Sequence, residues 1–161
     1  MLQIIRKALP QSLKRPPLMT DRAASLQALL RRAPYVQTLN MRCDIRGDEM
    51  TGIMRFDPRL IGNSAKNVLH GGAIGSFLEI TAMAQVFLLG DLDTPPRPIN
   101  LTIDYLRAGQ AEDMYARAIV TKMGRRIANV QCAAWQSDRE KPIASLRANF
   151  MLLPMETLPE K

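Results

Sequence analysis

The sequence predicts an α+β fold in which a six-stranded antiparallel sheet wraps around one long central helix. Residues 73–89 form a run long enough for a helix, and few of them are not apolar: Gly75, Ser76, Glu79, Thr81 and Gln85. A helix that is apolar on nearly every side must be enclosed by protein. Strand-like segments precede and follow this run, and short turns join consecutive strands, which favours antiparallel pairing. A sheet curled around the helix is the arrangement that covers most of its circumference.

The chain has 161 residues, which is enough for one ordinary domain with its own core. Residues 1–19 mix Lys and Arg with three prolines, a composition that resists regular structure. We therefore expect a loosely ordered basic leader over 1–19, one domain over 20–155 and a short tail over 156–161.

The first part of this domain is expected to contain a short helix and a hairpin. Thr20-Asp21 offers a helix N-cap, and apolar residues follow at helical spacing until Pro34. Residues 36–57 are strand-like, with a turn at 46–49 that predicts a β-hairpin. Residues 59–69 are polar and irregular, so we expect a loop that leads into the central helix.

Four strands are expected after the central helix. Residues 99–105 alternate apolar and polar side chains, and this period of two marks a strand with one buried face. Three more candidates lie near 111–123, 126–137 and 142–153, separated by segments with turn-forming residues. The hairpin and these strands give the six-stranded sheet.

The charge balance predicts an affinity for anions without identifying them. The formal net charge is +7 and the pI is near 9.9, so nucleic acid, an acidic membrane and coenzyme A are all candidates. Nucleic-acid binding favours clustered basic residues with interleaved aromatics. Because aromatics make up only 5% and Lys and Arg are scattered, we expect no nucleic-acid partner. A basic surface that only keeps the protein soluble is the alternative.

The cysteine and histidine content argues against a metal site. Cys43 and Cys132 lie far apart, and His70 is the only histidine, which leaves a zinc site almost without ligands. We expect reduced thiols and a cytoplasmic protein. The run 73–89 is slightly short for a bilayer and carries Glu79 in its middle, and the first residues lack a secretory pattern. We therefore expect no membrane partner.

Glu79 is the residue that most needs a chemical explanation. Burying a carboxylate in an apolar helix is costly unless the group is paired, protonated or used, and this helix contains no Lys or Arg. A pKa raised by desolvation would suit Glu79 to accept a proton from water. The alternative is that Glu79 points to solvent at a gap in the sheet or caps a neighbouring element.

Gly71-Gly72 precedes this apolar run and offers backbone N–H groups at the positive end of the helix dipole. Such a position can hold a developing oxyanion, although a diglycine is also common in tight turns. Eight residues separate Gly71 from Glu79, about 12 Å along one helix, so both cannot reach one carbonyl. If both serve one reaction, Gly71 comes from one copy and Glu79 from another, and a homodimer is required.

The segment around this diglycine resembles a family signature. Residues 63–72 read Asn-Ser-Ala-Lys-Asn-Val-Leu-His-Gly-Gly, and Leu78-Glu79 follows. The pattern is similar to Asn…His-Gly-Gly…Leu-Asp/Glu in hotdog-fold thioesterases of the phenylacetic acid degradation (PaaI) type, with the acid nine residues after the histidine. Residues 103–107 and 124–128 resemble that family's third-strand and turn motifs. The resemblance covers about residues 36–153 and implies a hotdog fold that hydrolyses acyl-CoA to a free acid and CoA.

By this resemblance, Glu79 is the general base or the nucleophile, and the Gly71 amide polarises the thioester carbonyl. His70 shapes the loop and the oxyanion site rather than acting as the base. Asn63 orients water or the carbonyl, but it stands one residue farther from the histidine than in relatives with aspartate as the acid. Asn67 is its substitute.

The remaining site residues are expected to bind substrate. Some relatives place a catalytic Ser or Thr at the start of the third strand, where this chain has Pro98. Arginines in turns can bind CoA phosphates through charge-assisted hydrogen bonds, or they can simply be solvated. The predicted substrate-binding residues are Gly72, Asn67, Asn100, Thr102, Arg107, Gly124, Arg125 and Arg126.

The sequence thus predicts an acyl-CoA thioesterase that works as a homodimer, or a homotetramer, with no metal and no cofactor besides the coenzyme A of its substrate. Three alternatives stay open: a hotdog protein that binds acyl-CoA without hydrolysing it, a thioesterase for acyl-carrier-protein substrates, and a hydratase or dehydratase. A buried acid argues against the first, since pure binding gains nothing from it. The His-Gly-Gly context of His70 fits a thioesterase better than a hydratase. Neither the acyl group nor the choice between dimer and tetramer follows from the sequence.

Overall fold

The computed structural model describes residues 19–90, 92 and 94–152. Most of the predicted leader, residues 1–18, and the segment 153–161, which contains the predicted tail, lie outside the described residues. The chain begins with α1 (Met19–Arg32) and α2 (Pro34–Thr38). Helix α1 starts before Thr20, so the expected N-cap at Thr20-Asp21 is wrong and both residues lie inside the helix.

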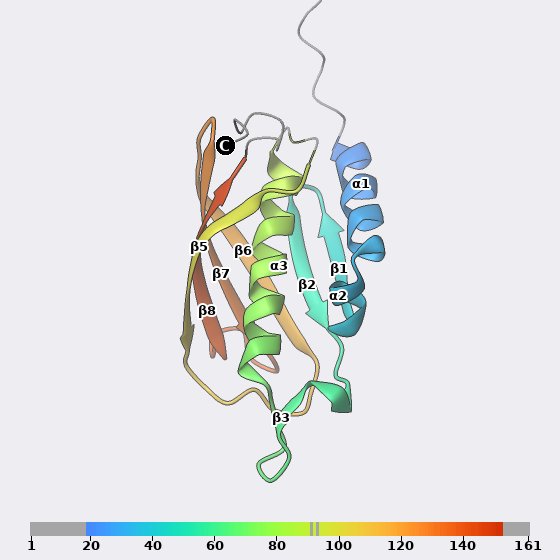
Figure 1. Ribbon diagram of the computed structural model, residues 1–161, viewed down its shortest axis with the longest axis vertical. Helices are drawn as coiled ribbons and strands as arrows, with labels where there is room; N and C mark the ends of the chain where they lie inside the picture. The colour runs from blue at the N-terminus through green and yellow to red at the C-terminus, as the bar shows by residue number, and fades with distance from the viewer. Residues whose placement is uncertain (1–18, 91, 93, 153–161) are drawn as a thin grey trace, which may run out of the picture.

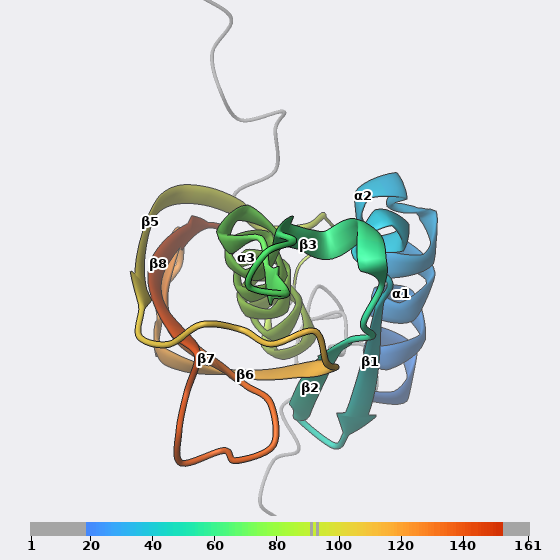
Figure 2. The same cartoon turned by 90° about the horizontal axis from the view of Figure 1, so that it is seen from below.

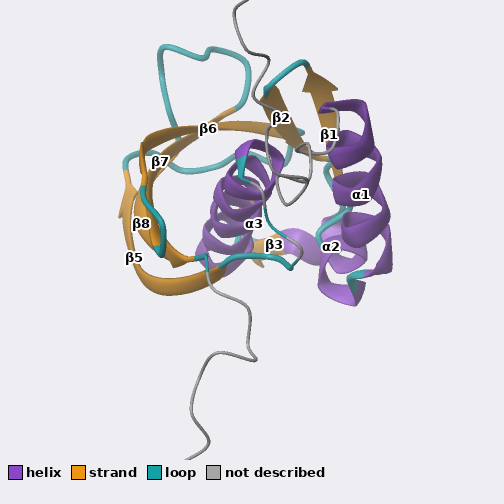
Figure 3. Cartoon of the chain, turned by 90° about the horizontal axis from the view of Figure 1, so that it is seen from above, coloured by secondary structure: helices purple, strands orange, loops and turns teal. Residues whose placement is uncertain are grey.

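The sheet confirms the predicted α+β wrap. Its six strands are antiparallel and follow the order β1-β2-β6-β7-β8-β5, while α3 runs through the curl (Figures 1, 2 and 3). The bounds of these elements are β1 (Met41–Arg46), β2 (Glu49–Met54), α3 (Gly71–Leu89), β5 (Arg97–Tyr105), β6 (Met114–Met123), β7 (Ile127–Trp135) and β8 (Ala144–Met151).

Helix α3 forms the centre of the core. Phe77, Leu78 and Val86 are fully buried under the sheet, as expected for an apolar helix enclosed by protein. Its length and composition would also allow it to cross a membrane, but most of the helix is buried inside this fold. One stripe along α3 stays partly open, and we call it the open stripe: Gly72, Ser76, Glu79, Ile80 and Met83. Gly72, Ser76, Glu79 and Met83 recur every three or four positions, and Ile80 lies four residues after Ser76, so the five residues share one helix face.

Buried Gln85 on α3 anchors the β1–β2 hairpin. Its Oε1 accepts from the Met50 N–H at 2.9 Å, and its Nε2 donates to the Asp48 carbonyl at 2.6 Å. The turn includes Gly47 at φ 62°, a left-handed conformation that glycine adopts readily. The hairpin predicted with its turn at 46–49 is confirmed, and a buried amide holds it against the central helix.

Two local predictions differ from the structure. Pro34 does not simply end the first helix. It occupies the first turn of α2, where a proline is tolerated because its missing N–H would have no helical partner. The strand-like pattern from residue 36 therefore becomes strand only at Met41. The expected loop 59–69 contains a 3₁₀ turn (Pro58–Leu60) and a small two-stranded sheet of β3 (Ile61–Asn63) and β4 (Val68–Leu69).

Replacing Gln85 with Leu is expected to lower the free energy of unfolding by about 1–3 kcal/mol, because the Met50 N–H loses its buried acceptor. Thr81→Val is the matched control on the same helix. The Thr81 hydroxyl only donates to the Phe77 carbonyl of α3, at 2.8 Å, so this change is expected to have a smaller effect. Urea unfolding at one fixed protein concentration measures both variants. Equal losses would contradict the anchoring role of Gln85.

Candidate active site

His70 caps the N-terminus of α3. Its backbone is extended, and its Nδ1 accepts the Gly72 N–H at 2.9 Å. Its own backbone N–H donates to the Leu60 carbonyl at 2.8 Å. Because Nδ1 is an acceptor, the neutral ring carries its proton on Nε2. The histidine thus fixes the entry of the loop into α3 and engages one of the first amides of the helix.

The Gly71 amide is left free by this arrangement. The His70 carbonyl accepts from the Ala73 N–H at 3.0 Å and from the Ile74 N–H at 3.2 Å. Both bonds polarise the peptide group that carries the Gly71 N–H, which strengthens it as a donor. Within the described residues, this N–H has no acceptor. A free donor at the positive end of a long helix is suited to a developing negative charge.

Tyr105, at the end of β5, contacts the same helix terminus. Its hydroxyl donates to the Gly71 carbonyl at 2.9 Å. A Cβ added to Gly75 would lie 3.0 Å from this hydroxyl, so the absence of a side chain there allows β5 and α3 to approach closely. The sequence predicted Tyr105 as a member of the buried face of a strand and of the segment 103–107 that resembles the family's third-strand motif. The residue is instead 54% exposed and lies beside Gly71, and no sequence pattern signalled the hydrogen bond.

Glu79 lies two turns farther along α3, in the open stripe. Its carboxylate is partly buried, and desolvation raises its pKa, which confirms the predicted direction. No salt bridge or hydrogen bond offsets this cost among the residues that the structure describes. Glu79 also lies at a gap that the sheet leaves along α3. The raised pKa and the access from solvent together suit a group that exchanges protons with a ligand.

The open stripe is bordered by different elements on its two sides. On one side, the Tyr35 hydroxyl of α2 lies 3.2 Å from the Ser76 Oγ. On the other, β5 packs near Gly71 and Gly75 through Tyr105. Viewed along α3, the helices α1 and α2 and the strand β5 stand on opposite sides of it (Figure 2). The stripe therefore lies between α2 and β5, with Glu79 within it.

The two predicted asparagines lie in the β3–β4 hairpin. The Asn63 Oδ1 accepts the Lys66 N–H at 3.1 Å inside the turn, and Asn67 adopts a positive φ of 52°. Neighbouring Gly62 packs so tightly that an added Cβ would lie 2.6 Å from the His70 Cα. The hairpin therefore supports the loop that carries His70, while the Asn63 side chain is engaged in its own turn.

One copy of the chain does not bring the other predicted residues to this site. Asn100 and Thr102 lie on the outer face of β5, and the Asn100 Oδ1 accepts from the Asn149 Nδ2 at 2.7 Å. Arg107 donates to the Pro142 carbonyl at 2.7 Å. The β6–β7 turn, which carries Gly124, Arg125 and Arg126, lies at the end of the sheet opposite to the start of α3 (Figure 1). Only His70, Gly71 and Gly72 meet directly.

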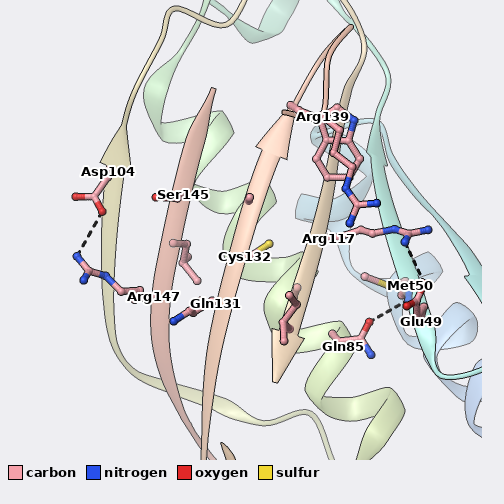
Figure 4. Close-up of a pocket in the computed structure, with 15 residues that line it drawn as sticks. Glu49, Met50, Gln85, Asp104, Arg117, Gln131, Cys132, Arg139, Ser145 and Arg147 are labelled. Carbon is pink, nitrogen blue, oxygen red and sulfur yellow. Dashed lines mark hydrogen bonds and ion pairs between the residues drawn. The ribbon is translucent and has the colours of Figure 1, made fainter. Parts of the chain in front are cut away.

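A cavity of about 570 Å³ lies on the outer face of the sheet with α3 behind it (Figure 4). Two ion pairs line it, Arg117–Glu49 at 3.0 Å and Arg147–Asp104 at 3.4 Å. It does not include His70, Gly71 or Glu79. In the described part of the chain, no group of three or more His, Cys, Asp or Glu residues could hold a metal ion. The predicted site residues of α3 thus lie outside this cavity.

Comparison with known proteins points to one superfamily. The thioesterase superfamily model matches residues 66–143, which include α3 with Glu79 and the strands β5, β6 and β7. The medium/long-chain acyl-CoA thioesterase YigI of Escherichia coli (strain K12) is 26% identical over 133 residues, covering 74% of this chain and 85% of the relative.

Solved structures share the fold. A protein from Chromobacterium violaceum is 31% identical, with a TM-score of 0.66, and the match covers 85% of this chain and 97% of that one. A phenylacetic acid degradation-related protein from Ralstonia eutropha is 22% identical, with a TM-score of 0.67, and the match covers 78% of this chain and 98% of that one. At this lower identity, the second likeness concerns the fold alone.

The capping role of His70 predicts that two substitutions at this position lower the free energy of unfolding by different amounts. His70→Ala is expected to lower the free energy of unfolding by about 1 kcal/mol, because the Gly72 N–H loses its acceptor. His70→Asn is expected to lose less, since asparagine is among the best N-cap residues. Thermal unfolding of both variants at equal concentration measures the difference. Equal losses for both variants would mean that the cap hydrogen bond contributes nothing measurable.

Proposed function

The chain belongs to the thioesterase superfamily as a thioester hydrolase, and we propose that it hydrolyses acyl-CoA to a free acid and CoA in a site shared by two copies of the chain. The observation that carries this proposal is the free, polarised Gly71 N–H at the start of α3, beside an amide that His70 already engages. The proposed reaction needs no cofactor, and coenzyme A takes part only as a portion of the substrate. The proposed location of the protein is the cytoplasm.

In this mechanism, the thioester carbonyl oxygen accepts a hydrogen bond from the Gly71 N–H. As water attacks the carbonyl carbon, negative charge moves onto this oxygen, and the fixed donor stabilises it more than it stabilised the neutral carbonyl. His70 contributes by holding the loop and the Gly72 N–H in place. Tyr105 holds the Gly71 carbonyl from the other side. Neither side chain needs to transfer a proton.

Glu79 of the partner subunit serves as the general base. Its carboxylate takes a proton from the attacking water, and the resulting tetrahedral intermediate collapses with cleavage of the C–S bond. The proton then passes from Glu79 to the departing thiolate, which leaves as CoA thiol, and the new acid releases its own proton to solvent. The raised pKa of Glu79 supports this role, because a base whose pKa lies closer to the working pH transfers protons more effectively.

The separation of the two groups on α3 supports the proposed dimer. An antiparallel pair of α3 helices brings Gly71 of one copy opposite Glu79 of the other when the twofold axis passes close to Gly75, midway between them. The small residues Gly72 and Ser76 in the open stripe leave room for close approach. Among the described residues, β5 is an edge strand that pairs only with β8, and an unpaired edge is a template for pairing with another chain.

The acyl group is proposed to be medium or long, as the name of the Escherichia coli relative states for that protein. Ile80 and Met83 in the open stripe offer apolar contacts next to Glu79. A carrier-protein thioester is the competing substrate. Comparison of turnover on the same acyl group attached to CoA and to acyl carrier protein discriminates between them.

Glu79→Gln is expected to lower kcat by roughly 10²–10⁴-fold, the usual contribution of a general base. The KM is expected to change little, because the amide keeps the shape of the carboxylate. Thiol release from short-, medium- and long-chain acyl-CoAs measures both constants, with exposed Glu140→Gln as the matched control. Wild-type turnover in Glu79→Gln would refute the assigned base. Unchanged turnover would also exclude Glu79 as the nucleophile, because an acyl-enzyme at this position needs the carboxylate.

The raised pKa of Glu79 predicts two pH effects of defined sign. Activity needs the ionised carboxylate, so kcat/KM should fall at low pH through a pKa above the ordinary value of glutamate, about 4.3. The folded state binds this proton more tightly than the unfolded state, so the Glu79 contribution to stability decreases as pH rises through that interval. The stability of Glu79→Gln relative to wild type should therefore increase from pH 4 to pH 7. A difference in the free energy of unfolding between the variant and wild type that stays constant over this pH range would contradict the raised pKa of Glu79.

A further inference from the structure

The Ser76 hydroxyl on α3 forms its hydrogen bond outside its own helix. Thr81, which is buried on the same helix, donates to the Phe77 carbonyl four residues back, at 2.8 Å, a common arrangement for a hydroxyl inside a helix. Among the described residues, Ser76 makes no such bond to α3. Its Oγ lies instead 3.2 Å from the Tyr35 hydroxyl of α2. The Ser76 hydroxyl is therefore held at the side of the open stripe that α2 borders.

Tyr35 is the second member of this hydroxyl pair. It is 53% exposed, although its neighbour Val36 on α2 is buried. A phenol is more acidic than an aliphatic alcohol and is therefore the better hydrogen-bond donor, so the Tyr35 hydroxyl donates to the Ser76 Oγ. A hydroxyl oxygen has two lone pairs, and this bond occupies one of them. The second lone pair of the Ser76 Oγ stays available to a ligand in the open stripe.

Glu79 lies next to Ser76 on the same helix face. Residues three positions apart on a helix are neighbours, with about 5–6 Å between their Cβ atoms. Both side chains are partly exposed, and the Glu79 carboxylate has no hydrogen bond or salt bridge to any residue that the structure describes. The Ser76 Oγ and the Glu79 carboxylate thus offer two acceptors at a spacing that one water molecule can bridge.

We propose that Ser76, held by Tyr35, orients the water molecule that Glu79 activates. This assignment rests on the proposed thioesterase function. The water donates one hydrogen to the Glu79 carboxylate and the other to the Ser76 Oγ, so an oxygen lone pair faces the thioester carbonyl carbon. Glu79 takes its proton as the new C–O bond forms, while Ser76 and Tyr35 keep theirs. Ser76 touches the reacting water directly, and Tyr35 is a positioning residue that acts through Ser76.

The proposed dimer brings this water to the thioester. When the twofold axis passes close to Gly75, Ser76 and Glu79 of the partner subunit lie opposite Ile74 and Gly71 of this chain. A water between those two acceptors then faces the first turn of this chain's α3, where the free Gly71 N–H holds the carbonyl oxygen. Fixing the water in this orientation before the reaction lowers the entropic part of the barrier.

Ser76→Ala is expected to lower kcat for acyl-CoA hydrolysis by roughly tenfold with little change in KM, because one of the two acceptors that orient the water is lost. Ser76→Thr keeps the hydroxyl and should retain most of the rate. Tyr35→Phe should lower kcat by a smaller factor, and it should have no further effect when combined with Ser76→Ala. Thiol release measures these variants, with Ser145→Ala on β8 as the matched control.

Hydroxylamine gives a readout that a merely structural role would not produce. It is a stronger nucleophile than water, and its nitrogen attacks the thioester to give a hydroxamate and CoA thiol without any oriented water. Ser76→Ala should therefore lose hydrolysis but form hydroxamate at nearly the wild-type rate.

Three results would contradict this account. Equal losses with water and with hydroxylamine would overturn the proposal, because Ser76 would then shape the site or form a bond to the acyl group itself. Independent, multiplicative losses for Tyr35→Phe and Ser76→Ala would overturn the positioning role of Tyr35. A wild-type protein that releases no thiol from acyl-CoA with either nucleophile would overturn the proposed function, and the role of Ser76 with it.

Discussion

The structure depends on the need to enclose one almost entirely apolar helix. Helix α3 buries residues such as Phe77 and Leu78 completely, and a curled antiparallel sheet is what encloses them (Figure 2). A curl of six strands does not close around the helix, so the open stripe and the helix N-terminus stay accessible. Two groups that can act chemically on a substrate lie where the enclosure ends: the free Gly71 N–H and the Glu79 carboxylate. The same packing requirement that folds the chain thus determines where a substrate can reach α3.

This incomplete enclosure links stability to the proposed function. Glu79 bears a desolvation cost that no cation offsets among the described residues, and such a cost is typical of functional positions. The contacts that hold the backbone in place lie at the N-terminus of α3. His70 caps the helix, Tyr105 donates to the Gly71 carbonyl, and Gly62 allows His70 to pack closely. A preorganised donor with a less constrained base fits a site in which the base arrives from a second copy of the chain.

The sequence predicted the fold well because its strongest signals are local. The apolar run of α3, the alternation in β5 and the turn at 46–49 each report on one element, and the His-Gly-Gly motif located the helix start. Prediction was weaker where contacts join distant segments. The hydrogen bonds Tyr105–Gly71 and Asn149–Asn100 depend on the relative placement of separate elements, and no local pattern encodes it. Pro34 was misread because proline is compatible with either side of a helix boundary.

The claim that each site combines Gly71 of one copy with Glu79 of another is tested most directly by complementation. Gly71→Pro removes the proposed oxyanion donor at a helix position that tolerates proline, and Glu79→Gln removes the base. Each variant alone should be nearly inactive. When equal amounts are mixed under exchange conditions, half of the dimers are mixed and one of their two sites is intact, so thiol release should recover to about one quarter of the wild-type rate. Mixtures that stay as inactive as the separate variants, although mixed dimers have formed, would contradict the shared site.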